Sequence, residues 1–219
     1  MNKRQWKKQR YRWKTGTAKE RKRNRELCHR YPFLIPRNVW TGKICWDKPY
    51  SYTVAEYFPR GWWKAFGIQM CEELRDALIK TGNLYTFRFD QIKEKYGELR
   101  AYNHGGNEVA DRVINDYMHI SRNVCITCGK PDVPVVMESW IMPECESCWM
   151  KGGERRKKYI KTDYFNHETY LRLTKDQDGI IPSSYDVLCF RNGNSEKVTY
   201  DVTDKVERIR KRYYERNGR

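Results

Sequence analysis

Apolar side chains recur at three- and four-residue spacing between Gly61 and Gly82. This spacing places them on one face of an α-helix, and a glycine often follows the last helical residue. The segment from about residue 107 to 120 has the same spacing, so two amphipathic helices are predicted. The residues on the two faces are Trp63, Phe66, Met70, Leu74, Ala77 and Leu78 in the first helix, and Val109, Val113, Tyr117 and Ile120 in the second.

Alternating apolar and polar residues predict two β-hairpins. In the first, residues 85–90 alternate, a turn is expected near Lys95-Tyr96-Gly97, and residues 99–102 return. In the second, residues 185–191 and 197–202 flank Asn192-Gly193-Asn194, a sequence that favours a tight turn.

Two further helices are predicted in basic segments. Residues 18–30 follow Thr15 and Thr17, either of which is a suitable N-cap, and the segment after Asp201 and Thr203 is similar. Proline and glycine interrupt residues 31–59, so this stretch is expected to be mostly irregular.

These elements predict an α+β fold with a small mixed body, a four-cysteine module and basic extensions. We expect residues 1–30 to form a basic arm and residues 31–122 to form the α+β body. Residues 123–161 are expected to form a four-cysteine zinc module, of the zinc-ribbon or treble-clef kind, with a basic tail. Residues 162–219 are expected to form a C-terminal hairpin and a basic helix.

Composition indicates a folded protein that does not enter a membrane. The chain is 33% charged, yet it contains 16 Tyr, 8 Trp and 7 Phe, too many aromatic residues for a disordered chain. It has no run of about 18 apolar residues, and its N-terminus is too basic for the apolar part of a signal peptide. We therefore expect a cytoplasmic location, in which cysteines serve as thiols or metal ligands rather than disulfides.

The net charge of +16 is concentrated in three segments. Residues 1–30 carry a net charge of +11, and residues 151–161 and 205–219 carry +5 each, so the rest of the chain is acidic, at −5. Such segments attract polyanions, and nucleic acid, RNA or DNA, is the common polyanion of a cytoplasm. The predicted contacts to nucleic acid are Lys3, Arg4, Trp6, Lys7, Lys8, Arg10, Arg12, Trp13, Lys14, Arg21, Lys22, Arg23, Arg25, Lys151, Arg155, Arg156, Lys157 and Lys158.

Four cysteines have the spacing of a zinc site. Cys125 and Cys128 form one C-x2-C pair, and Cys145 and Cys148 form a second pair after sixteen intervening residues. Four thiolates suit the tetrahedral geometry of Zn²⁺, and a site closed by four protein ligands is typical of a structural ion. Iron–sulfur ligation, redox dithiols and a chance pairing of the cysteines are the alternatives. The segment between the pairs is predicted to form a small two-stranded connection.

No catalytic motif is evident in the sequence. It has no phosphate-binding loop, nucleophile elbow or HExxH helix. His104, near Asp90, Glu94 and Glu98 in the sequence, is the one candidate for a catalytic group. A structural or solvent-exposed histidine is the simpler interpretation.

The sequence resembles a set of small uncharacterised bacteriophage proteins over about residues 27–148. The resemblance rests on LCHRYPFLIPRNVWTGK at 27–43, on QIKEKYGELRAY at 91–102, and on the CITCG and CESC pairs. It implies a zinc-binding α+β protein acting in an infected bacterium, and it supplies no catalytic residues.

Three functions are open at this point. The leading hypothesis is a non-enzymatic zinc protein whose basic segments contact the phosphates of nucleic acid, with Trp6 and Trp13 stacking on bases. The second is a module that docks on a host enzyme, a ribosome or a virion component. The third is a nuclease or nucleotide-acting enzyme.

Overall fold

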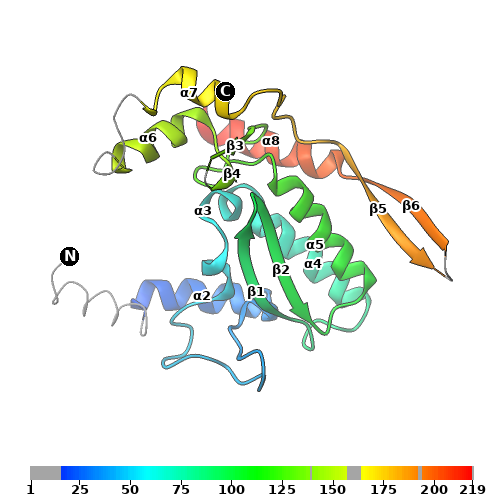
Figure 1. Ribbon diagram of the computed structural model, residues 1–219. Helices are drawn as coiled ribbons and strands as arrows, with labels where there is room; N and C mark the ends of the chain where they lie inside the picture. The colour runs from blue at the N-terminus through cyan, green and yellow to red at the C-terminus, as the bar shows by residue number, and fades with distance from the viewer. Residues whose placement is uncertain (1–15, 139, 157–163, 192–193, 219) are drawn as a thin grey trace. The chain divides into compact units, whose positions relative to one another are not determined.

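The computed structural model describes residues 16–138, 140–156, 164–191 and 194–218 (Figure 1). These residues form helices and three two-stranded sheets, which confirms the predicted α+β class. The chain divides into two compact units. The first contains the chain up to Phe58, Ile68–Lys93 and Arg100–Ile114, and the second contains Pro59–Gly67, Glu94–Leu99 and the chain from Asn115 onward.

The first unit begins with α2 (Ala18–Arg30), which has a capping box at its N-terminus. The hydroxyl of Thr17 accepts a hydrogen bond of 3.2 Å from the backbone N–H of Glu20. The Glu20 carboxylate in turn accepts one of 2.7 Å from the backbone N–H of Thr17. The predicted helix is confirmed, and Thr17 is its cap. Two 3-10 helices, Pro32–Leu34 and Val54–Tyr57, interrupt the irregular segment that follows.

Aromatic residues and one helix form the core of the first unit. The rings of Phe33, Phe87 and Phe89 meet edge to face, with centroids 5.2–5.8 Å apart. The predicted apolar face of α4 (Ile68–Lys80) is buried, including Leu74 and Leu78.

The first hairpin consists of β1 (Arg88–Lys95) and β2 (Glu98–His104). The turn is at Tyr96-Gly97, as predicted, and both residues have positive φ, as a two-residue hairpin turn requires. The strand begins three residues later than its alternation suggested. Asn83 accepts hydrogen bonds from the N–H groups of Thr86 and Phe87, and this turn holds the segment out of the sheet.

The predicted helix over residues 107–120 is confirmed as α5 (Glu108–Ser121), with the side chain of Asn107 accepting hydrogen bonds from two N–H groups of its first turn. Val109 was expected on its apolar face but is exposed. Ala110 and Ile114 are buried there instead.

The second unit begins with α3 (Arg60–Trp62) and a π-helical turn, Trp63–Gly67. Its later elements are β3 (Val135–Met137), β4 (Ile141–Pro143), α6 (Glu146–Arg156), α7 (His167–Leu173), β5 (Ser184–Arg191), β6 (Asn194–Asp201) and α8 (Thr203–Asn217). Figure 1 shows β5 and β6 side by side, with β6 leading into α8. The predicted C-terminal hairpin and helix are therefore confirmed.

Two carboxylates fix the C-terminal elements within the second unit. Buried Asp116 accepts hydrogen bonds from the Tyr185 hydroxyl at 2.7 Å and from Lys205 Nζ at 2.9 Å. Arg210 binds both carboxylate oxygens of Asp132, at 2.7 and 2.8 Å. Two cations of α8 are thus neutralised by contacts that hold the fold together.

Candidate metal centre

The thiols of Cys125, Cys128, Cys145 and Cys148 form one cluster. Their sulfur atoms lie within 4.8 Å of one another, and the Sγ atoms of Cys128 and Cys145 are 3.7 Å apart. All four are free thiols. It is the one group of three or more potential metal ligands among the residues that the structure describes. The geometry is therefore compatible with a metal site, as the spacing predicted.

A tight turn carries the first pair of cysteines. The backbone N–H of Cys125 donates to the carbonyl of Lys130 at 2.8 Å, and that of Gly129 donates to the carbonyl of Cys125 at 2.9 Å. Gly129 has a φ of +85°, a conformation that other residues rarely adopt. We refer to residues 125–130 as the knuckle. Its backbone points both sulfurs of the pair toward one position.

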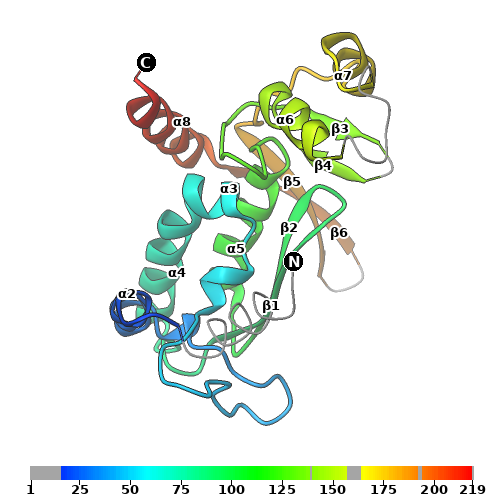
Figure 2. The same cartoon turned by 90° about the vertical axis from the view of Figure 1, so that its left-hand side faces the viewer.

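The second pair lies at the start of α6. Cys145 directly precedes the helix and its N–H donates to Cys125 Sγ at 3.5 Å, which joins the two pairs, while Cys148 lies in the first turn. Figure 2 shows α6 beside the β3–β4 hairpin, so the order along the chain is knuckle, hairpin, helix. The N-terminus of a helix carries partial positive charge and favours thiolates.

The residues after Cys148 were expected to form a basic tail, but as far as Arg156 they form helix α6. Trp149, in the first turn of this helix, is the apolar residue that could have indicated a packed helix there. It is 1% exposed and packs with Val136, Phe165 and Tyr170. The Tyr170 hydroxyl also donates a hydrogen bond of 2.8 Å to the carbonyl of Glu144, beside the second pair. Residues far along the chain thus hold the second pair in position.

Helix α3 also contacts the backbone of the knuckle. The N–H of Gly61 donates to the carbonyl of Ile126 at 2.8 Å. A β-carbon at Gly61 would lie 2.2 Å from the Cys125 carbonyl oxygen, and one at Gly129 would lie 2.7 Å from the Gly61 carbonyl oxygen. The two backbones can approach this closely because both positions are glycine.

The four thiols perturb one another strongly. Hydrogen bonds from Cys125 and Cys145 lower the pKa of Cys128. Hydrogen bonds from the same cluster raise the pKa of Cys145, and burial raises that of Cys148. Four thiolates this close repel one another, so complete ionisation requires a cation among them.

A pocket of about 240 Å³ lies next to the knuckle, and we call it the cationic pocket. Cys128 and Gly129 line it on one side, and Lys64, Arg212 and Arg216 bring positive charge to it. None of the described residues that line it is acidic. The sequence showed that the C-terminal helix is basic, but it did not indicate that part of this charge lies beside the cysteines.

The π-helical turn shapes this pocket. Its carbonyls at Lys64 and Ala65 accept hydrogen bonds from Arg216 Nη1 at 2.8 Å and Arg212 Nη1 at 3.3 Å. Gly67 is required for the turn because a β-carbon there would lie 2.3 Å from the Trp63 ring. The predicted single helix over residues 61–82 is thus interrupted where it meets α8.

The predicted nucleic-acid contacts fall into three groups. On α2, Lys22, Arg23 and Arg25 are exposed, while Arg21 is half-buried and donates to the carbonyl of Gly16. Lys151, Arg155 and Arg156 belong to α6, and Lys151 is exposed. The predictions that lie outside the described residues are Lys3, Arg4, Trp6, Lys7, Lys8, Arg10, Arg12, Trp13, Lys14, Lys157 and Lys158.

The acidic residues considered for catalysis have other partners. Asp90 pairs with Arg88, Glu94 accepts a hydrogen bond from the N–H of Gly97, and Glu98 pairs with Arg122. His104 is exposed.

No helix within the described part of the chain is long and apolar enough to cross a membrane. Comparison of the chain with protein-family models, curated proteins and solved structures gives no match. The resemblance to small bacteriophage proteins therefore stays a prediction.

Proposed function

We propose that the four cysteines bind a structural zinc ion in a treble-clef-like module. Around a tetrahedral zinc ion with Zn–S bonds of about 2.3 Å, sulfur atoms lie about 3.8 Å apart. The distance of 3.7 Å between Cys128 and Cys145 supports this assignment. A helix that bears the second pair favours a treble clef over a ribbon, in which a second hairpin bears it.

Zinc in this site acts by stabilising the fold. Four protein ligands leave no open coordination position for water or substrate, so the ion is not the centre of a hydrolytic reaction. Binding free energy is converted into folding free energy in small metal modules. Any activity of the module is therefore carried by the side chains around it.

We further propose that the protein binds nucleic acid, with the cationic pocket as a phosphate-binding site. The observation that carries this proposal is the concentration of positive charge from Lys64, Arg212 and Arg216 in one hollow that no described carboxylate lines. Within the described part of the chain, none of these three side chains forms an ion pair.

The guanidinium groups are suited to phosphate. Arg212 and Arg216 each use one N–H group on a backbone carbonyl, which fixes the side chain and leaves other donors for an anion. In contrast, Lys205 and Arg210 on the same helix are already paired with carboxylates. Among the described residues, Lys22, Arg23 and Arg25 of α2 and Lys151 of α6 are also exposed, and each offers a further cation to a polyanion.

A bound zinc tetrathiolate carries net negative charge, and the same three cations also reduce its electrostatic cost. This local role predicts effects on metal retention, whereas phosphate binding predicts effects on affinity for nucleic acid. The two roles can therefore be measured separately in the same variants.

The test is binding of fluorescently labelled single-stranded RNA and duplex DNA at several salt concentrations. Lys64→Gln with Arg212→Gln is expected to weaken binding and to reduce the salt slope by about 0.7 per lost phosphate contact on a single strand. Lys175→Gln, an exposed position outside the pocket, is the matched control. Unchanged affinity and slope, with zinc content retained, would contradict phosphate binding at this site.

A specific observation also favours the protein-docking alternative. Met137 and Trp140, near the tip of the β3–β4 hairpin, are 59% and 64% exposed. Exposed apolar side chains of this kind are common at protein interfaces. If Met137→Ser with Trp140→Ser abolishes recovery of a partner from nuclease-treated bacterial lysate, and the lysine and arginine variants do not, docking is favoured.

A further inference from the structure

A second pocket, of about 400 Å³, lies within the first unit, between the loop after Pro36 and strand β1. Small-molecule sites typically measure about 300–1,000 Å³ and combine apolar walls with a few polar groups. This pocket has that composition. Its aromatic residues include Trp40, Tyr52 and Tyr57, and its polar residues include Asn38, Asp90 and Gln91.

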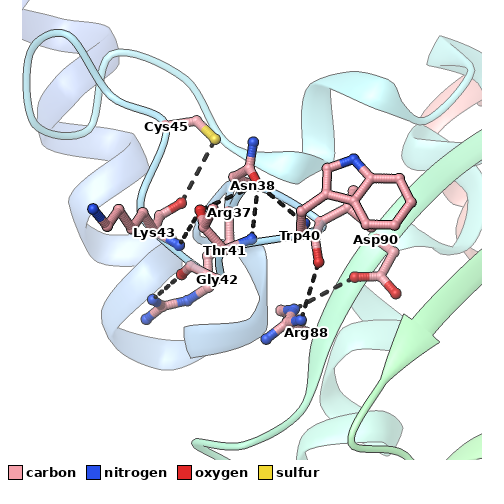
Figure 3. A network of polar contacts seen from close by, with 10 residues as sticks. Arg37, Asn38, Trp40, Thr41, Gly42, Lys43, Cys45, Arg88 and Asp90 are labelled. Atoms are coloured by element: carbon pink, nitrogen blue, oxygen red, sulfur yellow. Dashed lines mark hydrogen bonds and ion pairs between the residues drawn. The ribbon is translucent and has the colours of Figure 1, made fainter.

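Trp40 is highly exposed on a loop that is held in one conformation. The residue is 92% exposed. The side-chain oxygen of Asn38 accepts hydrogen bonds from the backbone N–H groups of Trp40 at 3.0 Å and Thr41 at 2.9 Å, and the Asn38 N–H donates to the carbonyl of Lys43 at 2.8 Å (Figure 3). A large ring on a preorganised loop loses little conformational freedom when a ligand stacks on it.

The loop is also tied to β1 and to itself. Arg88 reaches the carbonyl of Val39 and the carboxylate of Asp90, each at 3.4 Å, and Arg37 donates to the carbonyl of Gly42 at 3.0 Å. In Figure 3 the Trp40 ring lies on the β1 side of the loop, as the Asp90 carboxylate does. An aromatic platform and an acceptor group therefore face the same pocket.

Asp90 retains capacity to accept hydrogen bonds. Its side chain is 21% exposed, and Oδ1 faces Arg88, whereas no described residue donates to Oδ2. A carboxylate in partly desolvated surroundings binds best to a ligand that offers two adjacent N–H donors.

We propose that this pocket binds an unpaired guanine base, stacked on Trp40 and hydrogen-bonded through its N1–H and N2 amino group to Asp90. Guanine presents two adjacent N–H donors on its Watson–Crick edge, whereas adenine, cytosine and uracil each present one donor group there. Stacking of bases on aromatic side chains and recognition of their Watson–Crick edges are the usual means of reading single strands. Where the guanine belongs to an oligonucleotide, the inference rests on the proposed nucleic-acid function; a free guanine nucleotide offers the same chemistry.

The first arm of the test measures GMP and IMP binding to the full chain by calorimetry. IMP lacks the N2 amino group and is otherwise the same ligand. We expect GMP to bind about tenfold more tightly than IMP. The second arm compares single-stranded uridine oligonucleotides that carry one guanosine or one inosine, and it distinguishes a base in a strand from a free nucleotide.

Variants of the pocket residues test whether the preference for guanine over hypoxanthine arises in this pocket. Trp40→Ala is expected to weaken GMP or the guanosine oligonucleotide about tenfold or more, and Trp40→Phe to restore most of the affinity. Asp90→Asn is expected to abolish the preference for guanine over hypoxanthine. Arg88→Gln loosens the loop without removing the acceptor, so it should weaken both ligands equally and keep the preference.

The result that overturns the proposal is the absence of a guanine preference in both arms, or a preference that survives Trp40→Ala and Asp90→Asn. Lys64→Gln with Arg212→Gln serves as the comparison. Loss of oligonucleotide binding there with GMP binding retained confirms that phosphate and base sites act separately. Failure of the phosphate site alone leaves GMP binding as an independent test of the base pocket.

Discussion

The indole Nε1–H of Trp62 donates a hydrogen bond of 2.7 Å to the carbonyl oxygen of Val124, and both residues are fully buried. Val124 directly precedes Cys125, and the carbonyl on the other side of that cysteine, at Ile126, accepts a hydrogen bond from Gly61. Helix α3 therefore holds the backbone on both sides of Cys125, the first thiol of the cluster. A segment distant in the sequence sets the position of one of the four sulfur atoms.

Trp62→Phe is expected to destabilise the metal module and to accelerate zinc loss. The substitution leaves the buried Val124 carbonyl without its donor and opens a small cavity, with a combined cost of about 2–4 kcal/mol. Urea denaturation measures the free energy of unfolding, and competition with a chromogenic chelator measures zinc release. Trp140→Phe is the control, because Trp140 is 64% exposed and bonds to Glu94 at the surface. Equal effects of the two substitutions would contradict the role given to Trp62.

Gly61→Ala is expected to displace the knuckle although it changes no ligand. The added β-carbon would lie 2.2 Å from the Cys125 carbonyl oxygen and 2.5 Å from that of Ile126, and backbone atoms there cannot move without moving the cysteine. We expect a loss of about 1–3 kcal/mol in stability and weaker zinc retention. Gly82→Ala is the comparison: its β-carbon meets nothing within 4 Å, so it carries only the cost of a positive φ, which Gly61 does not have, and it should lower stability without weakening zinc retention. Zinc retention that is unchanged in Gly61→Ala would show that the knuckle tolerates displacement.

Local patterns predicted most of the fold. The three- and four-residue spacing gave α5 and most of the helix before Gly82, and the turn residues at Tyr96-Gly97 gave the first hairpin. The errors arose where distant contacts override local pattern. The π-helical turn depends on contacts of Lys64 and Ala65 with α8, which periodicity cannot reveal.

The candidate site was likewise predictable only where local spacing specifies it. Two C-x2-C pairs specify their ligands by spacing alone, and the structure brings those four sulfurs together. The cationic pocket was not predictable, because Lys64 and Arg216 are far apart in the sequence and meet through tertiary packing. Likewise, no motif joins Trp40 to Asp90, which line one pocket.

Removal of the metal is expected to unfold the module that contains α6. Cys125→Ser removes one of four thiolates, and the remaining ligands bind zinc far more weakly. We expect zinc content to fall and the buried cluster around Trp149 to lose its order, which near-ultraviolet circular dichroism and tryptophan fluorescence report. Cys45→Ser is the control because that thiol is exposed and lies outside the cluster. A folded, zinc-loaded Cys125→Ser protein would contradict the assignment of this ligand.

The stability of the second unit is expected to decrease as the pH falls below about 6.5, the usual pKa of histidine, because of His119. Its ring stacks on that of Tyr185 with centroids 4.6 Å apart, and its Nε2 is buried without a hydrogen-bond partner among the described residues. Burial lowers the pKa of His119, and Arg122 lowers it further, while Asp116 acts in the opposite direction.

The direction of this pH dependence follows from proton binding at His119 in the folded and unfolded states. Below the ordinary histidine pKa the unfolded chain binds a proton at His119 that the folded chain does not, so acid favours unfolding, and the stabilisation is present at neutral pH. His119→Phe keeps a ring to stack on Tyr185 and removes the titration. We therefore expect urea denaturation between pH 7 and pH 5.5 to give a smaller decrease in unfolding free energy for His119→Phe than for the unmodified protein. Both proteins share any acid-induced loss of zinc, so identical decreases in the two would mean that His119 does not titrate differently in the folded and unfolded states.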